Sequence, residues 1–488
     1  MRSRCSGLVV HNMGTAQGQN VRGMRGMGAV FEGLRGTRNA IMVVHSKNLM
    51  NVPFLSRERT VAPPLFNRWL VPPAAIAVHM CIGQVYAFSV FNKPLASALG
   101  VEITRVQFAY QIALMMLGIS AAVFGKWVER SGPRKTMIAS WGCFCGGLLL
   151  SALAVRMGSL GLLLVGYGVV GGIGLGLGYI APVSTLVKWF PDRPGMATGM
   201  AIMGFGGGAL IGSPLAQELM KHFAQSGLGG TVDTLMVMAL GYSVFMWFGA
   251  LLVRVPAPDW KPVGWEPSAA TASITSACVA VDVAWKTPQF WLLWLVLCMN
   301  VSAGIGVLGR AADMCQDMFG VSAAIAAGFT GLLSIFNMGG RFVWSSISDF
   351  TGRKTVYSIY FVLGALLYAV LPYAQRTQNR TVFVICTALI ISMYGGGFAT
   401  IPAYLRDLFG THQVGAIHGR LITAWSMAAV IGPGLINGLF DQRVAEGVAR
   451  GEAYNGTFLL MCGLLGVGFV ANLLVRPVDP RHHLSKLS

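Results

Sequence analysis

One arginine, Arg341, lies inside a long apolar stretch of the sequence. A charged side chain at the centre of a membrane helix costs about 2.5 to 3.5 kcal/mol on insertion scales, so such a residue needs an explanation. A guanidinium group can bind a carboxylate through two parallel hydrogen bonds, and Arg341 therefore indicates a site for a small organic anion. Two other interpretations stay open. Arg341 could extend to the membrane surface, or it could pair with Asp349, about 12 Å further along a helix.

Polar and aromatic residues at helical spacing form a second group of candidates. His79, Gly83 and Tyr86 follow one another at i, i+4 and i+7 on one face of a helix. Gln84 lies beside that face. Later apolar stretches carry further aromatic candidates, namely Tyr179, Tyr394 and Phe398. Histidines and aromatic pairs at this spacing also occur as ordinary packing, so both the binding and the packing interpretations are kept.

Acidic residues are absent from the middle of every apolar stretch, which argues against a proton relay between carboxylates. A transported proton would then be carried by the substrate or by His79. The sequence has no CxxC pair, HExxH helix or EF-hand loop, and it predicts no enzyme, no metal site and no cofactor. GYGVVGG from Gly166 fits G-x-G-x-x-G, but no strand precedes it and no acid follows it. It predicts close helix packing.

The composition places these candidates in a membrane protein. Of 488 residues, 54% are hydrophobic and 11% are charged, whereas soluble proteins have about 25% charged residues. Several apolar stretches can cross the roughly 30 Å hydrocarbon layer as helices, so we predict an all-α membrane protein. The twelve predicted spans are 69–91, 106–125, 136–155, 160–187, 196–216, 235–253, 288–309, 322–346, 355–374, 381–404, 413–439 and 456–474.

Apart from Arg341 and Arg420, the basic residues that give the formal charge of +18 lie outside these spans. They are more numerous on the side of both chain ends, which predicts cytoplasmic termini in the cell inner (plasma) membrane. The excess charge is therefore assigned to the cytoplasmic face and to lipid headgroups, not to nucleic acid.

The chain divides at two places. Residues 1–66 are a basic block without a span, predicted to be a disordered extension; a start at Met50 is favoured, and a targeting leader stays open. The stretch 254–287 is rich in Pro, Ser, Thr and Ala and predicts a cytoplasmic linker. The predicted parts are thus the extension 1–66, a six-helix half 67–253, the linker 254–287, a second half 288–475 and a cytoplasmic tail 476–488.

An internal repeat of about 220 residues relates the two halves. GKWVERSGPRK from Gly125 recurs as SDFTGRK from Ser348. Pro182 in the fourth span matches Pro402 in the tenth at the same offset. Parallel halves with a site between them are typical of alternating-access carriers. The repeated loop predicts a gate that latches two helices, or else a basic anchor with a turn glycine. Its residues are Gly125, Glu129, Arg130, Gly132, Arg134, Asp349, Gly352, Arg353 and Lys354.

These two loops resemble the acid-x-x-Gly-Arg-Lys loops of the major facilitator superfamily, over roughly 69–475. Four segments are most similar to the oxalate/formate antiporter family and its monocarboxylate (pyruvate/lactate-type) relatives: NRWLVPPAAIAVHMCIGQVYAFSVFNKPL from Asn67, GYIAPVSTLVKWFPDRPG from Gly178, FNMGGRFVWSSISD from Phe336 and GRLITAWSMAAVIGPGLING from Gly419. The resemblance implies the twelve-helix, two-half fold, with spans 1, 4, 7 and 10 lining the cavity. It also implies a second intramembrane cation in the oxalate-exchanging branch, where this chain has Trp425.

One cation suits a monoanion better than a dianion, by charge matching in a low-dielectric cavity. We therefore predict a secondary active transporter for a monocarboxylate such as formate, lactate or pyruvate, functional as a monomer, with oxalate less favoured. Arg341 has Ala121 as its repeat counterpart, so the symmetric scaffold does not need it. A sensor that binds a carboxylate without transport is the alternative. The sequence leaves exchange, proton symport and uniport open.

Overall fold

The computed structural model describes residues 53–63, 65–225, 230–258, 260–266 and 278–484. The predictions for residues 1–52, including the start at Met50, and for most of the linker's Ser/Thr/Ala run lie outside these ranges. The described chain is helical, and the predicted all-α membrane fold of two six-helix halves is confirmed. The exact boundaries predicted between extension, halves, linker and tail stay predictions.

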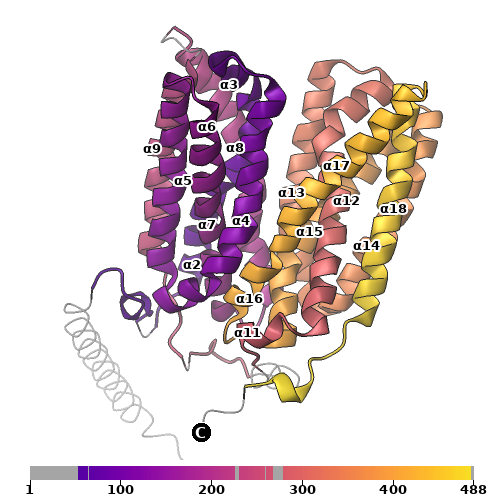
Figure 1. Cartoon of the computed structure of the whole chain (residues 1–488). Helices are drawn as coiled ribbons and strands as arrows, with labels where there is room; N and C mark the ends of the chain where they lie inside the picture. The colour runs from indigo at the N-terminus through magenta and orange to yellow at the C-terminus, as the bar shows by residue number, and fades with distance from the viewer. Residues whose placement is uncertain (1–52, 64, 226–229, 259, 267–277, 485–488) are drawn as a thin grey trace, which may run out of the picture. The chain divides into compact units, whose positions relative to one another are not determined.

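The helices before the linker form one bundle, and the helices after it form a second (Figure 1). The first bundle comprises α2 (Val71–Ile82), η3 (Gly83–Phe91), α3 (Asn92–Leu99), α4 (Ile103–Ser131), α5 (Pro133–Arg156), α6 (Leu160–Leu163), η4 (Leu164–Gly171), α7 (Gly172–Trp189), α8 (Pro194–His222) and α9 (Thr231–Leu252). The second comprises α12 (Pro288–Phe319), α13 (Ala323–Thr351), α14 (Arg353–Arg376), α15 (Arg380–Phe409), α16 (Val414–Leu421), α17 (Thr423–Ala445) and α18 (Arg450–Leu474).

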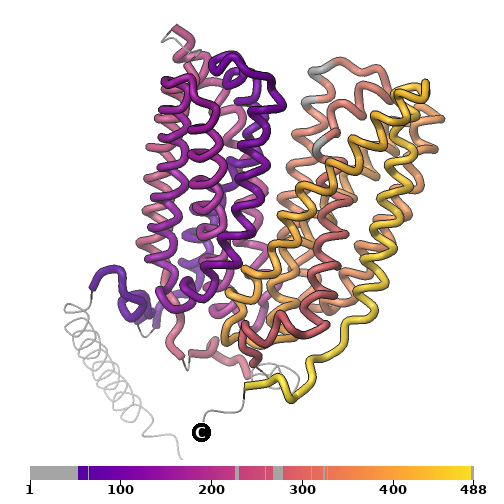
Figure 2. The backbone as a smooth tube through the Cα atoms, in the orientation of Figure 1, coloured from indigo at the N-terminus to yellow at the C-terminus, as the bar shows by residue number. Residues whose placement is uncertain are grey.

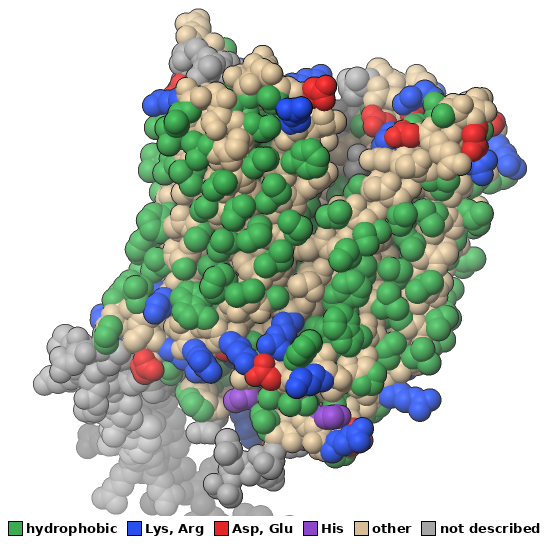
Figure 3. Space-filling model, in the orientation of Figure 1, with side chains coloured by type: hydrophobic (Ala, Val, Ile, Leu, Met, Phe, Trp, Pro, Cys, Tyr) green, Lys and Arg blue, Asp and Glu red, His purple; other side chains and the backbone are tan. Residues whose placement is uncertain are grey.

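Eleven stretches of the described chain are long and apolar enough to cross a membrane, and the 29-residue α13 completes the bundle. Most observed helices extend a few residues beyond the predicted spans. The first span begins with the 3-10 turn η2 (Arg68–Leu70) and is 3-10 again at η3, between α2 and α3. The eleventh span is divided into α16 and α17 at Ile422. The space-filling view shows hydrophobic side chains along the flanks and charged ones at the two ends (Figure 3). This distribution fits a bilayer around the flanks.

Two glycines end equivalent helices in the two halves. Gly132 ends α4 with φ of +81°, and Gly352 ends α13 with φ of +86°. Residues other than glycine rarely adopt a positive φ. At these two glycines it lets the chain reverse directly into α5 and α14. Proline begins α5, and internal prolines recur at Pro182 in α7 and Pro402 in α15. The residues that repeat in the sequence therefore occupy equivalent positions in the helices of the two halves.

The two halves contact each other through two pairs of long helices. The helix α8 of the first half packs along α13 and α15, and α4 packs along α16 and α17. In the tube view the two bundles come together toward the end where the linker runs (Figure 2). In the described residues, the hydrogen bonds between halves run from the middle of the bundle to the end that carries the linker. Ser426 of α17 donates to the Leu114 carbonyl (2.8 Å), and Thr198 of α8 donates to the Ala399 carbonyl (2.8 Å). We call this end, where α9 ends and α12 begins, the linker end.

Candidate functional site

Arg341 lies on α13 where that helix faces α8 of the other half, and its side chain is completely buried. Its Nε donates to Oδ1 of Asn337 (3.2 Å), and its Nη1 donates to the carbonyl oxygen of Ile202 (3.3 Å). Its Nη2 has no hydrogen-bond partner among the described residues. In this structure the side chain neither extends to the surface nor pairs with Asp349, whose partners are described below. Arg341 therefore presents an Nη2 group whose N–H donors have no acceptor among the described residues, in a buried place.

Two aromatic rings from different halves enclose the guanidinium. The Arg341 Cζ lies 5.8 Å from the ring centroid of Phe205 on α8 and 5.1 Å from that of Phe398 on α15. Glycines make room for it: a Cβ on Gly206 would lie 2.9 Å from the Arg341 Nε, and one on Gly395 would lie 3.2 Å from its Cγ. Cation–π contacts stabilise the charge without offering an acceptor, so the Nη2 donor stays available.

The other aromatic candidates extend this cluster across both halves. Tyr179 lies 5.3 Å from Phe398 and 5.5 Å from His79, measured between ring centroids. Phe398 in turn lies 5.8 Å from Trp425. Tyr86 reaches the cluster through Phe205 at 5.2 Å. Ring contacts therefore connect most of the predicted site residues to one another and to Arg341.

Several polar atoms of this cluster are buried and have no partner in the described chain. They are the hydroxyl oxygens of Tyr86, Tyr179 and Tyr394, the indole Nε1 of Trp425 and the Nη2 of Arg341, and the hydroxyls of Tyr86 and Tyr394 lie close to each other. Leaving a buried polar group unpaired costs about 1 to 3 kcal/mol, more for a charged one, and native proteins rarely keep several together. All five can donate a hydrogen bond. A ligand rich in acceptor oxygens, such as a carboxylate, would satisfy them.

Gln84 differs from the other candidates. It is fully buried, and its side-chain atoms are also unpaired, but it lies against Gly212 of α8 inside the first half. No ring contact joins it to Arg341. The sequence did not indicate three residues of the cluster, namely Phe205, Asn337 and His418. His418 lies on α16, and its ring centroid is 5.5 Å from that of Tyr179. Glycine next to an aromatic residue, as in GFGGG, was the available signal for Phe205.

No group of three or more His, Cys, Asp or Glu side chains gathers as a metal site in the described ranges. The described polar groups around Arg341 are hydrogen-bond donors and one cation, and such a set can bind and orient an anion.

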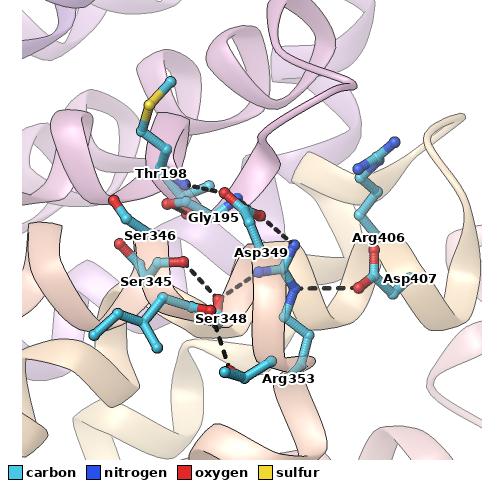
Figure 4. Close-up of polar contacts among 12 residues, drawn as sticks. Gly195, Thr198, Ser345, Ser346, Ser348, Asp349, Arg353, Arg406 and Asp407 are labelled. Atoms are coloured by element: carbon cyan, nitrogen blue, oxygen red, sulfur yellow. Dashed lines mark hydrogen bonds and ion pairs between the residues drawn. The ribbon is translucent and has the colours of Figure 1, made fainter.

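The repeated loop of the second half forms a contact between halves at the linker end (Figure 4). The carboxylate of Asp349 on α13 accepts hydrogen bonds from the backbone N–H groups of Gly195 and Met196, both at 2.8 Å. These groups are the unpaired donors at the start of α8, where a negative charge is stabilised. Arg353 also donates to Asp349 (2.6 Å) and to Asp407 (3.1 Å). The loop thus holds α8 against α13.

The equivalent loop of the first half makes a different contact. Glu129 accepts from the Nζ of Lys188 on α7 at 2.5 Å, within its own half. Its Oε1 has no hydrogen-bond partner among the described residues, although a Cβ on Gly415 of α16 would lie 2.5 Å from it. Arg134 is buried and donates to the Ala250 carbonyl of α9. Close approach also occurs at Gly125, where a Cβ would lie 2.9 Å from the Cα of Ala416. Of these two acids, Asp349 binds a helix start of the other half, whereas the described partner of Glu129 lies in its own half.

The short helix α11 (Val281–Ala284) joins the halves at the same end. Asp282 forms ion pairs with Lys126 of α4 and with Arg420 of α16 (3.0 Å). Arg420 also donates to the Val281 carbonyl at 2.8 Å. Hydrogen bonds from Lys126 and Arg420 hold the pKa of the Asp282 carboxyl below its ordinary value. Asp282 is exposed, so water and salt screen the pairs.

We expect Asp282→Asn to loosen this bridge at low ionic strength and to have no effect in 1 M salt, where the Debye length is about 3 Å. A lowered folded-state pKa means that the stabilisation is present above the ordinary carboxyl pKa and is lost as the pH falls through the lowered one. Thermal unfolding of both proteins in detergent, at low and high salt and at pH 7 and pH 3, measures the difference. Equal melting temperatures at low salt and pH 7 would contradict it.

Comparison with known proteins identifies transporters with the same two-bundle fold. The sequence profile described as Major Facilitator Superfamily matches residues 74–433 and 316–488. The uncharacterized MFS-type transporter YhjX of Escherichia coli is 26% identical over 75% of this chain and 86% of its own length. The oxalate:formate antiporter of Oxalobacter formigenes is 25% identical over 86% of this chain and 93% of its own. The apicoplast pyruvate carrier 1 of Toxoplasma gondii is 26% identical over 69% of each chain.

Solved structures show the same fold. The Escherichia coli fucose:proton symporter FucP superposes with a TM-score of 0.59 at 15% identity, covering 84% of this chain and 100% of that one. At this identity the likeness concerns the arrangement of helices alone.

Proposed function

The chain belongs to the major facilitator superfamily of membrane transporters, and from that premise we propose that it is a secondary active carrier that moves a monocarboxylate by alternating access. The observation that carries the proposal is the buried guanidinium of Arg341, whose Nη2 is unpaired among several unpaired hydroxyl and indole donors. A carboxylate supplies the acceptors and the negative charge that this place lacks. Relatives named for oxalate and formate exchange and for pyruvate transport support an organic anion.

The charge at the site favours a monoanion. Among the described central residues the cluster contains one guanidinium, and the position of a second cation in the resembled oxalate exchangers holds the neutral Trp425. A dianion would bring one negative charge more than this cation can neutralise in a low-dielectric cavity. Formate, lactate and pyruvate fit this rule, and oxalate does not.

The contacts between halves suggest how the carrier moves. They gather from the middle to the linker end, where Asp349 and Asp282 each join the halves. We propose that the linker end is cytoplasmic, with both termini there, and that these contacts break when the halves rock to open that side.

Counterflow in proteoliposomes tests the function. Vesicles that hold purified protein and an excess of unlabelled formate, lactate or pyruvate are expected to accumulate the labelled form of the same anion, several-fold above protein-free vesicles. Labelled oxalate is expected to exchange more slowly than at least one of them. Oxalate exchange faster than every monocarboxylate would overturn the charge argument, and ligand binding without any counterflow would indicate a sensor.

A further inference from the structure

Three donor side chains of the central cluster lie against the same two rings. Arg341 lies beside Phe205 of the first half and Phe398 of the second. The ring of Tyr179 lies 5.9 Å from Phe205 and 5.3 Å from Phe398, measured between centroids. The indole of Trp425 lies 6.5 Å and 5.8 Å from the same two rings. The guanidinium, the phenol and the indole are therefore neighbours around one pair of rings.

The indole N–H of Trp425 is the most restrictive of these donors. The side chain is completely buried, and its Nε1 has no hydrogen-bond partner among the described residues. An indole nitrogen donates in the plane of its ring and cannot accept, whereas a tyrosine hydroxyl rotates and can do either. Trp425 therefore requires an acceptor atom at a fixed position.

The donors of the cluster outnumber the acceptor sites of a bare carboxylate. The Nη2 of Arg341 carries two N–H bonds, and Tyr179 and Trp425 carry one donor each. The hydroxyls of Tyr86 and Tyr394 lie close to each other, so one can donate to the other and one O–H remains. Together these groups offer about five hydrogens, whereas the two oxygens of a carboxylate offer about four lone-pair sites. Formate or acetate would leave a buried donor unpaired, which is costly.

We infer that the carried monocarboxylate has an oxygen on the carbon next to its carboxylate, as 2-oxo and 2-hydroxy acids do, and that the indole N–H of Trp425 donates to that oxygen. The inference rests on the proposed function and names the substrate class of the same site. Arg341 binds the carboxylate, and Trp425 determines which monocarboxylates are preferred. Both contacts are hydrogen bonds, and no covalent bond is made or broken.

A neutral donor suits a neutral oxygen. A second carboxylate beside Trp425 would bury a negative charge against a group that carries no charge. A carbonyl or hydroxyl oxygen accepts the same hydrogen bond without that cost. Pyruvate and lactate have such an oxygen, whereas formate, acetate and propionate do not.

Discrimination at such a site is strong because the rejected ligand leaves a donor unpaired. A site that forms a hydrogen bond with one group of its substrate disfavours an analogue without that group far more than an apolar pocket disfavours a missing methyl group. Propionate has the same charge and the same number of carbons as pyruvate and lactate, but no oxygen on its second carbon. It is therefore the matched analogue for a test.

The first test measures counterflow by the full chain in proteoliposomes at neutral pH, with labelled pyruvate, lactate, propionate and acetate at equal low concentration. Protein-free vesicles correct for undissociated acid that crosses the lipid. We expect the wild type to exchange pyruvate or lactate at least about tenfold faster than propionate and acetate. Propionate or acetate exchange as fast as the better of pyruvate and lactate would overturn the inference. This comparison needs no variant.

The second test uses Trp425→Phe, which keeps an aromatic ring beside Phe398 and removes the N–H. The ratio of pyruvate to propionate counterflow is expected to fall about tenfold. Propionate counterflow should stay at the wild-type level, because Arg341 still binds its carboxylate and propionate makes no bond to the indole. A wild-type ratio in Trp425→Phe would overturn the inference.

The matched control is Trp141→Phe on α5, which removes an indole donor within the first half. Trp141 donates to the hydroxyl of Ser243 on α9 (2.8 Å) and lies against the ring of Trp247. This variant is expected to keep the wild-type ratio, and an equal fall in both variants would overturn the inference. A wild type that exchanges none of the monocarboxylates, formate included, would instead refute the proposed function.

Discussion

Arg341→Gln is expected to abolish both ligand protection and counterflow. The substitution removes a buried cation whose Nη2 is unpaired in the described chain, and with it the fork that would hold a carboxylate. Losing a buried, hydrogen-bonded charge partner costs about 2 to 5 kcal/mol, which corresponds to roughly 30-fold to several-thousand-fold weaker binding. The measurement is the rise in melting temperature with added lactate, pyruvate and formate, which reports binding to the folded protein.

The unliganded protein is expected to respond in the opposite direction. An unpaired buried guanidinium is costly, so Arg341→Gln should melt at the same or a higher temperature than the wild type without ligand. Arg341→Lys is the matched control: it keeps the charge but not the fork, and an intermediate loss of protection is expected. Ligand protection at full strength in Arg341→Gln would show that the anion binds elsewhere.

Gly195→Ala is expected to slow transport at least fivefold by preventing closure of the linker end. A Cβ on Gly195 would lie 2.2 Å from the backbone oxygen of Ser345 and 2.8 Å from the Asp349 carboxylate. A backbone oxygen cannot move away by changing rotamer as a side chain can, so α8 and α13 must separate to make room for the methyl group. Overpacking of this kind costs about 1 to 3 kcal/mol, or roughly 5- to 150-fold in the balance between conformations. Counterflow rates, together with distances between spin labels across the linker end, measure the effect.

The control for this substitution is Gly331→Ala on α13. A Cβ on Gly331 would have no heavy atom within 4 Å, so the variant should transport like the wild type. Gly195→Ala at the wild-type rate, with unchanged spin-label distances, would show that the Asp349 contact does not gate transport.

The membrane class, the twelve spans and the repeat could be predicted from the order of residues alone. Hydrophobic runs are local and their length is fixed by the bilayer, so they can be read without knowing any partner. The repeated glycines, Gly132 and Gly352, could be found for the same reason, because a positive φ at a helix end is a local requirement. Arg341 stood out because a charge in an apolar run is unusual wherever the helix goes.

Contacts between side chains of different helices could be found only in the folded protein. Phe205 and Phe398 come from different halves, and only the crossing of α8 and α15 near α13 brings both to Arg341. The two repeated loops differ in the same way. Asp349 binds a backbone N–H of the other half, whereas Glu129 pairs with Lys188 in its own half. The contacts of the His79 ring with the carbonyl groups of Ala201 and Tyr179 could not be predicted from the sequence either. The partners of a side chain on other helices depend on the rotation of each helix about its axis and on its position along the membrane normal. Neither can be predicted from the local sequence.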